Sequence, residues 1–248
     1  MTAPANRKRR KLLAAAASTV AAAPGLRLME WAAAQSDAQP VTAATRWGLL
    51  IDTDKCAVDC DACVRACNDE HGLTGTGRPE TDAQWIRKVT LTDEHSGRVT
   101  SLPVLCQHCE QPPCVDVCPT GASFRREDGV VLVDKHTCIG CRYCVIACPY
   151  QARSFVHENL TAQKPYSPRG KGTVEGCTLC VHRIDEERAP ACVEVCNSGG
   201  GDDCGNGALL FGDLNDPQSA IARRLKSAPS RQLRADLDLN TGVRYENL

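Results

Sequence analysis

Sixteen of the seventeen cysteines fall into four tight quartets, which is the pattern in this chain most able to do chemistry. The quartets are Cys56-Cys60-Cys63-Cys67, Cys106-Cys109-Cys114-Cys118, Cys138-Cys141-Cys144-Cys148 and Cys177-Cys180-Cys192-Cys196. The third has the bacterial ferredoxin spacing C-x2-C-x2-C-x3-C-P, in which three thiolates bind one [4Fe-4S] cluster and the fourth reaches a second cluster. The second quartet has a longer gap and also ends in Cys-Pro. Together they predict a complete two-cluster module.

Other uses of cysteine fit this spacing less well. Neighbouring C-x2-C thiols rarely bridge one another, and the total is odd, which disfavours a disulfide framework. Structural zinc takes two short pairs set well apart, whereas the third quartet is crowded into one short segment. Covalent haem needs C-x-x-C-H, and no pair here is followed by histidine. We therefore expect an electron-carrying protein with no bond-making chemistry of its own.

The N-terminal segment has the order of a secretory signal. A basic run at 7–11 precedes Leu12-Leu13 and an alanine-rich stretch, and its paired arginines are typical of the twin-arginine type. We expect a signal peptide over 1–34, cleaved after Ala34 or earlier at Ala23. Export in folded form suits clusters that are assembled in the cytoplasm, so a periplasmic location is predicted.

The composition excludes some partners. Removing 1–34 leaves 23 basic and 29 acidic side chains, a net charge of −6, so nucleic-acid binding is not expected. No apolar run reaches the length of a membrane span, so any membrane contact requires a partner. Aromatic residues make up only 4% of the chain, so the clusters must replace part of the core. We therefore expect the cluster-free protein not to fold.

The chain also contains an internal duplication. Aspartate-led stretches precede the odd quartets, at Asp52 and Asp134, and the even quartets share P-C-V-D-V-C and A-C-V-E-V-C. Within the fold we expect strands over 130–133 and at 104–105, and single helical turns over 63–67 and 144–148.

The remaining segments read as connections and a tail. Segments 71–100 and 157–176 read as surface loops, because they are rich in glycine, threonine, proline and charge. Asp216-Pro217 predicts the start of a helix that runs to about Lys226, followed by a polar tail.

The histidines give one candidate site residue. His108 lies inside the second quartet and could donate to a cluster sulfur, although packing alone also explains it. The other histidines show no ligand spacing and are expected at the surface or in loops. They are His71, His95, His136, His157 and His182.

These motifs together resemble the four-cluster ferredoxin subunits of membrane-linked respiratory complexes, such as DmsB, PsrB and NrfC. The resemblance rests on C-P-T-G-A at 118–122, C-I-G-C-R-Y-C at 138–144, and F-G-D-L-N-D-P at 211–217. It implies an α+β fold with tandem bacterial ferredoxin-like modules, long loops and a short C-terminal helix. The cofactors implied are four [4Fe-4S] clusters.

In this family the two copies interleave, which implies a domain plan for the chain. The four-cluster region would span 46–212, with an inner module at about 101–156 and an outer module at about 46–70 plus 174–212. The polar helix and tail would occupy 213–248. The crossing rule then gives four ligand sets. They are Cys106, Cys109, Cys114 with Cys148; Cys138, Cys141, Cys144 with Cys118; Cys177, Cys180, Cys192 with Cys67; and Cys56, Cys60, Cys63 with Cys196.

The last set is irregular. Spacing from Cys192 favours Cys196 as the fourth ligand, whereas spacing to Gly207 favours Cys204, by analogy with Cys118 and Gly121. Cys204 is thus either an alternative ligand or a free thiol. The loop from Cys56 to Cys60 is also one residue longer than C-x2-C. An outer cluster that is labile, three-iron or unusual in potential is therefore expected.

The family resemblance also implies partners. An NrfD-like integral membrane subunit would exchange electrons with quinone, and a multihaem cytochrome c or other periplasmic redox subunit would be the second partner. The tail over 236–245 and the irregular outer quartets are similar to the DsrO branch, the periplasmic iron-sulfur subunits of sulfur-metabolism DsrMKJOP complexes. The alternative is the beta subunit of a molybdopterin reductase of the polysulfide, tetrathionate or dimethyl sulfoxide type, or an NrfC-like protein of nitrite reduction.

Overall fold

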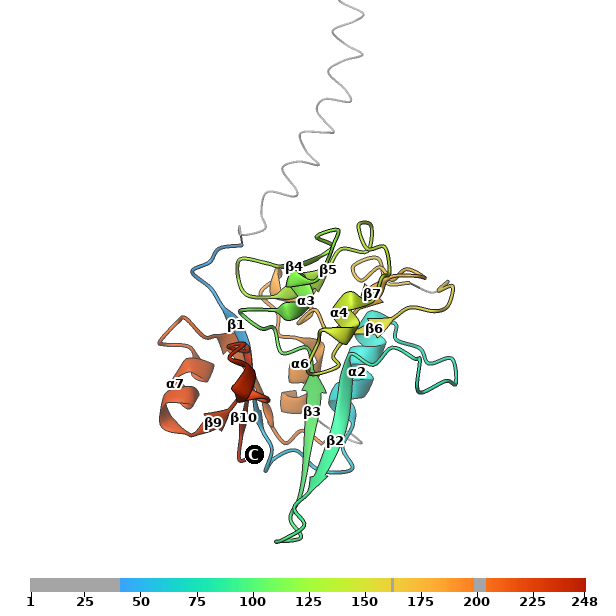
Figure 1. Ribbon diagram of the computed structural model, residues 1–248. Coiled ribbons are helices and arrows are strands. Elements are labelled where there is room, and N and C mark those ends of the chain that lie inside the picture. The colour runs from blue at the N-terminus through green and yellow to red at the C-terminus, as the bar shows by residue number, and fades with distance from the viewer. Residues whose placement is uncertain (1–40, 162, 199–203) are drawn as a thin grey trace, which may run out of the picture. The chain divides into compact units, whose positions relative to one another are not determined.

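A four-stranded sheet brings the two ends of the described chain side by side (Figure 1). The computed structural model describes residues 41–161, 163–198 and 204–248, so the expected signal peptide lies outside the described residues. Strand β1 (Trp47–Asp52) pairs antiparallel with β8 (Leu209–Asp213) and parallel with β10 (Val243–Glu246), and β9 (Ser230–Arg231) follows at the edge. The sheet therefore ties the segment before the first quartet to the C-terminus.

The C-terminal segment is not only a polar helix and tail, because β10 is an inner strand of this sheet. Val243 is 1% exposed and Tyr245 is fully buried, whereas Arg244 between them is half-buried. Buried and more exposed residues alternate in a strand, as they do here. The apolar pattern is short and lies among polar residues, so it was not recognised in the sequence. Glu246 is buried too, and its charge is paired with Arg224.

A long hairpin lies beside the sheet, formed by β2 (Ile86–Thr92) and β3 (Val99–Leu105). The prediction of a loop over 71–100 was therefore wrong for most of its second half. Ile86 is buried at the base, and exposure rises along β2 toward the turn, so the strand shows little apolar periodicity at its tip. The predicted strand at 104–105 is the end of β3.

The cysteine quartets lie on helices and on the turns before and after them. Two helices are longer than one turn and pack together, α2 (Ala62–His71) and α6 (Ala191–Ser198). Short helices α3 (Pro113–Asp116) and α4 (Tyr143–Ile146) also contact each other. The other small elements are β4 (Ser123–Arg125) paired with β5 (Val131–Val133), β6 (Ser154–Phe155) paired with β7 (Val174–Glu175), and α5 (Val181–Ile184).

The C-terminal helix α7 (Ala220–Ser227) begins later than predicted. Ser219, not Asp216, is its N-cap, and its hydroxyl accepts from the Ala222 amide at 3.1 Å. The Asp216 carboxylate instead accepts from the Gln218 amide at 2.8 Å, which closes a local turn before the helix. An aspartate followed by proline can be the N-cap of a helix or can close a turn before it, and the sequence pattern alone does not distinguish the two.

Cysteine sulfurs are part of the core. The largest buried apolar cluster includes Leu49, Ile51, Trp85 and Tyr245, together with five buried cysteines. Those cysteines are Cys63, Cys67, Cys177, Cys192 and Cys196. Within the described residues, no helix has the length and apolar character needed to cross a membrane.

Candidate iron-sulfur sites

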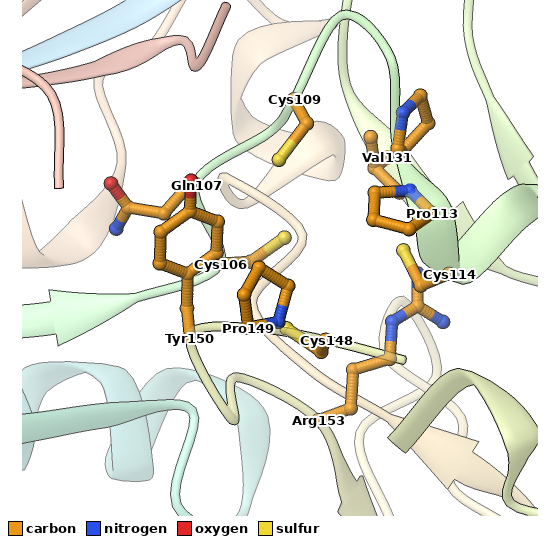
Figure 2. A pocket seen from close by; sticks show the side chains of 11 residues that line it. Cys106, Gln107, Cys109, Pro113, Cys114, Val131, Cys148, Pro149, Tyr150 and Arg153 are labelled. Atoms are coloured by element: carbon orange, nitrogen blue, oxygen red, sulfur yellow. The ribbon is translucent and has the colours of Figure 1, made fainter. Parts of the chain in front are cut away.

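Four cysteines converge on a small cavity next to α3 (Figure 2). Cys106, Cys109 and Cys114 come from the second quartet, and Cys148 is the last cysteine of the third. This is the first of the four sets expected from the sequence, including its crossing cysteine. Tyr150 and prolines form much of the wall of this cavity.

Arg153 supplies a buried positive charge to this cavity. Its side chain is 7% exposed, and Nη2 donates to Cys114 Sγ at 3.1 Å. Nη1 is buried and has no protein partner. A buried donor without an acceptor is costly, and the sulfides of a cluster would supply one. The residues present therefore fit an anionic iron-sulfur group.

The state of the thiols points the same way. Burial raises the pKa of Cys106 to about 12, with a further contribution from Cys114 and Cys148. Burial likewise raises the pKa of Cys63 to about 11. Thiols packed this closely can ionise together only when cations lie between them, and a coordinating metal deprotonates a thiol outright. The described residues do not bring three metal-ligand side chains close enough for one metal ion.

The second inner set is more open to solvent. Cys144 is buried, and burial raises the pKa of its thiol. The positive charge of Arg153 opposes that rise, whereas the nearby Cys114 and Cys118 add to it. Cys138 packs against the small core around Val131 and Val174, and Cys141 is exposed. Of the four expected cysteines, only Cys144 is buried, so this set lies nearer the surface than the first.

The outer sets are built by two facing helices. Cys63 and Cys67 are four residues apart on α2, and Cys192 and Cys196 are four apart on α6, so each pair lies on one helix face. The charge of Cys196 acts on Cys63, whereas the charges of Cys177, Cys192 and Cys180 act on Cys67. The charge of Cys63 also acts on Cys67 and on Cys192, so the cysteines of the two helices lie close together, and their division into two ligand sets stays a prediction.

His71 belongs to one of these groups, and its expected place at the surface or in a loop was wrong. It is 2% exposed, its Nε2 lies 3.3 Å from Cys180 Sγ, and its Nδ1 lies 2.8 Å from Ser167 Oγ. Burial lowers the pKa of His71 to about 4, so the ring is neutral near pH 7. His71 continues the four-residue spacing of Cys63 and Cys67 along α2, a signal that the sequence analysis overlooked.

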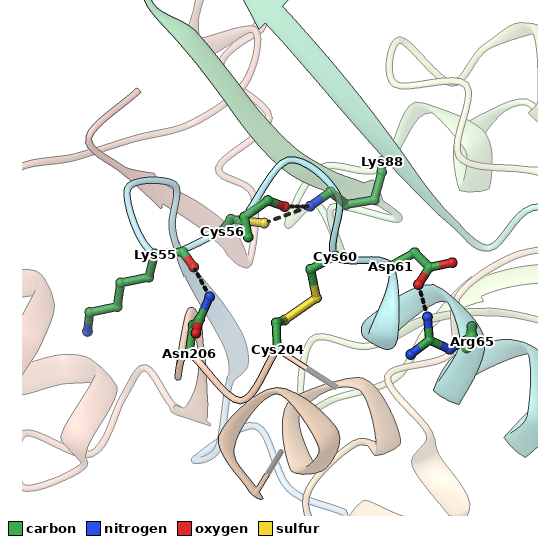
Figure 3. The surroundings of a disulfide bond; sticks show 9 residues. Lys55, Cys56, Cys60, Asp61, Arg65, Lys88, Cys204 and Asn206 are labelled. Carbon is green, nitrogen blue, oxygen red and sulfur yellow. Dashed lines mark hydrogen bonds and ion pairs between the residues drawn. A yellow bond between two sulfur atoms is a disulfide. The ribbon is translucent and has the colours of Figure 1, made fainter. Parts of the chain in front are cut away.

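The fourth group contains five cysteines, of which Figure 3 shows Cys56, Cys60 and Cys204. The residues that line its small cavity include Cys56, Cys60, Cys63, Cys196 and Cys204. Cys60 and Cys204 form a disulfide, so the expectation that Cys204 is a free thiol was wrong. The long Cys56–Cys60 loop and the insertion before Gly207 bring these two sulfurs together. Cys196 and Cys204 both line this cavity, so Cys204 does not take the place of Cys196.

Lys88 is a second charged residue that the sequence analysis did not identify. Its Nζ donates to Cys56 Sγ at 3.1 Å and to the Ala57 carbonyl at 2.8 Å (Figure 3). It lies on β2, far from any quartet in the sequence. A lysine in an unrecognised strand gave no signal from spacing.

His108 is buried but makes no hydrogen bond to a sulfur among the described contacts. Its Nδ1 accepts from the Val131 amide at 3.0 Å, and burial lowers its pKa to about 3. The proton is therefore on Nε2, which is buried without a protein partner. The role of His108 as a hydrogen-bond donor to a cluster sulfur stays a prediction.

Backbone amides also point at the cysteine sulfurs. Amides donate to a sulfur at 3.3–3.4 Å in each of four cases, which are Ser123 to Cys118, Ala152 to Cys148, Val174 to Cys138 and Leu179 to Cys177. Such bonds stabilise negative charge on the sulfur and are among the features that set cluster potential. The sites are thus preformed to hold anionic clusters.

Sequence comparison agrees with this chemistry. The profile of the 4Fe-4S dicluster domain matches residues 98–202. The Hdr-like menaquinol oxidoreductase iron-sulfur subunit 1 of Archaeoglobus fulgidus is 41% identical over 230 residues, covering 82% of this chain and 84% of that protein. The chain belongs to this family of 4Fe-4S dicluster subunits.

Other members of the 4Fe-4S dicluster family differ in the complexes that their names state. A tetrathionate reductase subunit of Salmonella typhimurium is 42% identical over 182 residues, covering 73% of this chain and 63% of that protein. The menaquinone reductase iron-sulfur cluster-binding subunit of Nitratidesulfovibrio vulgaris is 34% identical over 233 residues, covering 81% of this chain and 88% of that protein. The cofactors of the chain are [4Fe-4S] clusters, and sixteen quartet cysteines suit four of them.

Proposed function

We propose that this chain is a non-catalytic electron-transfer subunit whose four [4Fe-4S] clusters lie in two interleaved modules. The observation that carries the proposal is the grouping of cysteines from different quartets. Cys148 joins Cys106, Cys109 and Cys114 in one cavity, and Cys63 shares a cavity with Cys196. Neither grouping follows the order of the chain, and both suit the crossing pattern of two-cluster ferredoxins.

Close neighbouring sites support a continuous electron path. Cys63 and Cys67 belong to different groups and are separated by four residues of helix, a rise of about 6 Å. In the inner module, the charges of Cys114 and Cys106 in one set, and of Cys144 in the other, act on Arg153. Each module would therefore hold two clusters within short reach of each other.

Exposed apolar side chains support a partner surface around the second inner set. The three most exposed large apolar residues in the described part of the chain are Ile146 at 82%, Ile139 at 68% and Tyr143 at 59%. All three lie between the cysteines of the third quartet, which includes the exposed Cys141. Exposed apolar patches commonly mark protein contacts, so this cluster would exchange electrons with a partner subunit.

The proposed partners are an NrfD-like membrane subunit that reacts with quinone and a multihaem cytochrome c or other periplasmic redox subunit. The names of two relatives, menaquinol oxidoreductase and menaquinone reductase, support a quinone-linked complex. We further propose periplasmic export by the twin-arginine route and a DsrMKJOP-type complex of sulfur metabolism. The basic run before Leu12-Leu13 supports export by the twin-arginine route, and the irregular outer quartets support the DsrMKJOP-type complex.

A molybdopterin reductase is the second candidate complex, and the similarity to the tetrathionate reductase protein favours it. Gentle purification of the membrane assembly with a tagged chain separates the two. Co-purification of a multihaem cytochrome and an NrfD-like protein, without stoichiometric molybdenum, supports the DsrMKJOP type. About one molybdenum per chain would overturn it. A chain recovered alone and unaffected by membrane removal would instead indicate a diffusible ferredoxin.

A further inference from the structure

The outer cavity around Cys56 contains one cysteine more than a [4Fe-4S] cluster needs. Five cysteines line it, and two of them, Cys60 and Cys204, are joined (Figure 3). With that disulfide in place, three thiols are left for the cluster, Cys56, Cys63 and Cys196. A cubane takes four cysteines, one per iron, so the disulfide and a fully ligated four-iron cluster exclude each other.

The position of the disulfide makes it accessible to exchange. Cys60 and Cys204 are half-buried, whereas Cys63 and Cys196 are buried. The Cα atoms of the pair are 5.9 Å apart, within the usual range for a disulfide. Thiol–disulfide exchange requires access to the sulfur, and the buried thiols of Cys63 and Cys196 lack that access.

Lys88 stabilises the part of the site that the disulfide leaves intact. Its Nζ donates to Cys56 Sγ and to the Ala57 carbonyl, on the side of the loop that precedes Cys60. Cys63 and Cys196 are fixed by α2 and α6, which pack together. The three thiols outside the disulfide are thus held independently of it, whereas Cys60 and Cys204 lie on loops.

We propose that Cys60 and Cys204 form a redox latch that switches this site between four-iron and three-iron forms. When both thiols are reduced, Cys60 is the fourth cluster ligand. An incoming disulfide takes two electrons from the Cys60 thiolate and the Cys204 thiol, which become joined, while its own sulfur–sulfur bond breaks. The incoming disulfide leaves as one thiol, which takes the proton of Cys204, and one thiolate, because the ligating Cys60 sulfur carries no proton. Loss of the Cys60 ligand releases one Fe²⁺ from a [4Fe-4S]²⁺ core and leaves [3Fe-4S]⁰, so iron, sulfide and charge balance.

The latch would adjust one step of the electron path to the oxidation state of its compartment. Disulfides form and persist in oxidising compartments, and the proposed export would bring the chain into one. The inference rests on the proposed ligand set, but it concerns only one of four clusters. Among the described residues, the other three groups contain no disulfide, so they would keep their clusters when the latch closes.

The test uses full-length protein purified anaerobically with its clusters, treated with oxidised glutathione and then with a dithiol plus Fe²⁺. We expect a Cys60–Cys204 cross-linked peptide, loss of about one iron per chain, and a three-iron EPR signal after oxidation, all reversed by the dithiol and iron. Cys204→Ser should begin with the full iron content and show neither the peptide nor the signal. Asn206→Ala, which changes the same loop without removing a thiol, should behave as wild type.

The outcomes separate this inference from the proposed function. Retention of all iron with the cross-linked peptide present overturns the latch and leaves the electron-transfer proposal intact. Loss of a cluster from Cys204→Ser before any oxidant also overturns it, because Cys204 would then be a ligand. Peptide mapping of the wild type does not depend on how the variant folds. A protein that carries no clusters after anaerobic purification overturns both proposals.

Discussion

Arg153 donates a hydrogen bond from Nη2 to Cys114 Sγ at 3.1 Å while it is 7% exposed. Reduction adds negative charge to a cluster, and a nearby cation stabilises that form. A unit charge about 4 Å away is worth about 4 kcal/mol at an effective dielectric of about 20, and about 59 mV corresponds to each tenfold change in a one-electron couple. Arg153→Met should therefore lower the potential of an inner cluster by on the order of 100 mV in an EPR-monitored titration.

Two control variants isolate the role of this charge. Arg153→Lys keeps the charge and should recover most of the potential. Arg87→Met removes another arginine, whose Nη2 donates to the Tyr150 carbonyl at 2.8 Å, and should shift the inner cluster much less. Equal shifts in Arg153→Met and Arg87→Met would show that the hydrogen bond to sulfur has no special effect.

His71 should have a smaller effect on an outer cluster, because its ring is neutral. Nε2 carries the proton toward Cys180 Sγ when Nδ1 accepts from Ser167 Oγ. Losing one such hydrogen bond is worth about 1 kcal/mol, or roughly 40 mV. His71→Phe should lower the potential of one outer cluster by that amount, and Ser167→Ala by less. His182→Phe, which removes a neighbouring ring, is the control, and a matching shift there would contradict the assignment.

Ile146→Glu should weaken attachment to the membrane assembly without loss of clusters. Ile146 is 82% exposed, so a charge there costs the monomer little, whereas burial of that charge in an interface is unfavourable. Membrane-bound and released fractions, compared by immunoblot, measure the effect. Leu91→Glu is the matched control, since Leu91 is 45% exposed at the hairpin. Equal release by both variants would remove the support for a partner surface around the third quartet.

Tyr245→Phe should reduce stability, because the Tyr245 hydroxyl links the sheet to the hairpin. It donates to the Pro103 carbonyl at 3.1 Å and accepts from Gln107 Nε2 at 3.2 Å, and the residue is fully buried. Leaving those partners without a hydrogen bond costs about 1–3 kcal/mol, so the midpoint of thermal unfolding should fall by several degrees. Tyr166→Phe removes a hydroxyl bond from a 47% exposed ring and should change the midpoint little.

Removal of iron should unfold the protein. Buried sulfurs belong to the main core, where Cys63, Cys67 and Cys196 pack with Leu49 and Ile51, and burial raises the pKa of the Cys63 thiol. Without clusters, these sulfurs lose the atoms that pack between them and the positive iron that stabilises their thiolate form. Anaerobic chelation should abolish the near-UV circular dichroism together with the iron-sulfur absorbance. A cooperative thermal transition in cluster-free protein would contradict this expectation.

The sequence determined the chemistry of this protein, because cysteine spacing along the chain limits which thiols can share a cluster. The quartets indicated the family and the cofactor, and they predicted the grouping of Cys148 with Cys106, Cys109 and Cys114 that the structure shows. The strand over 130–133 and the helical segments around Cys63 and Cys144 were also predicted, since apolar runs and close ligand spacing are local signals.

The tertiary structure decided what surrounds the clusters. Lys88 and Arg153 reach cysteines that are 32 and 39 residues away in sequence, so no spacing rule links them. The spacing of His71 from Cys63 and Cys67 places it on their helix face, but its contact with Cys180, 109 residues away, depends on the folded chain. The Cys60–Cys204 disulfide spans 144 residues, and its formation likewise depends on the folded chain. The inner position of β10 depends on pairing with β1 at the other end of the described chain. Ligand identity is set by local spacing, whereas charge, hydrogen bonding and burial around the ligands depend on long-range packing.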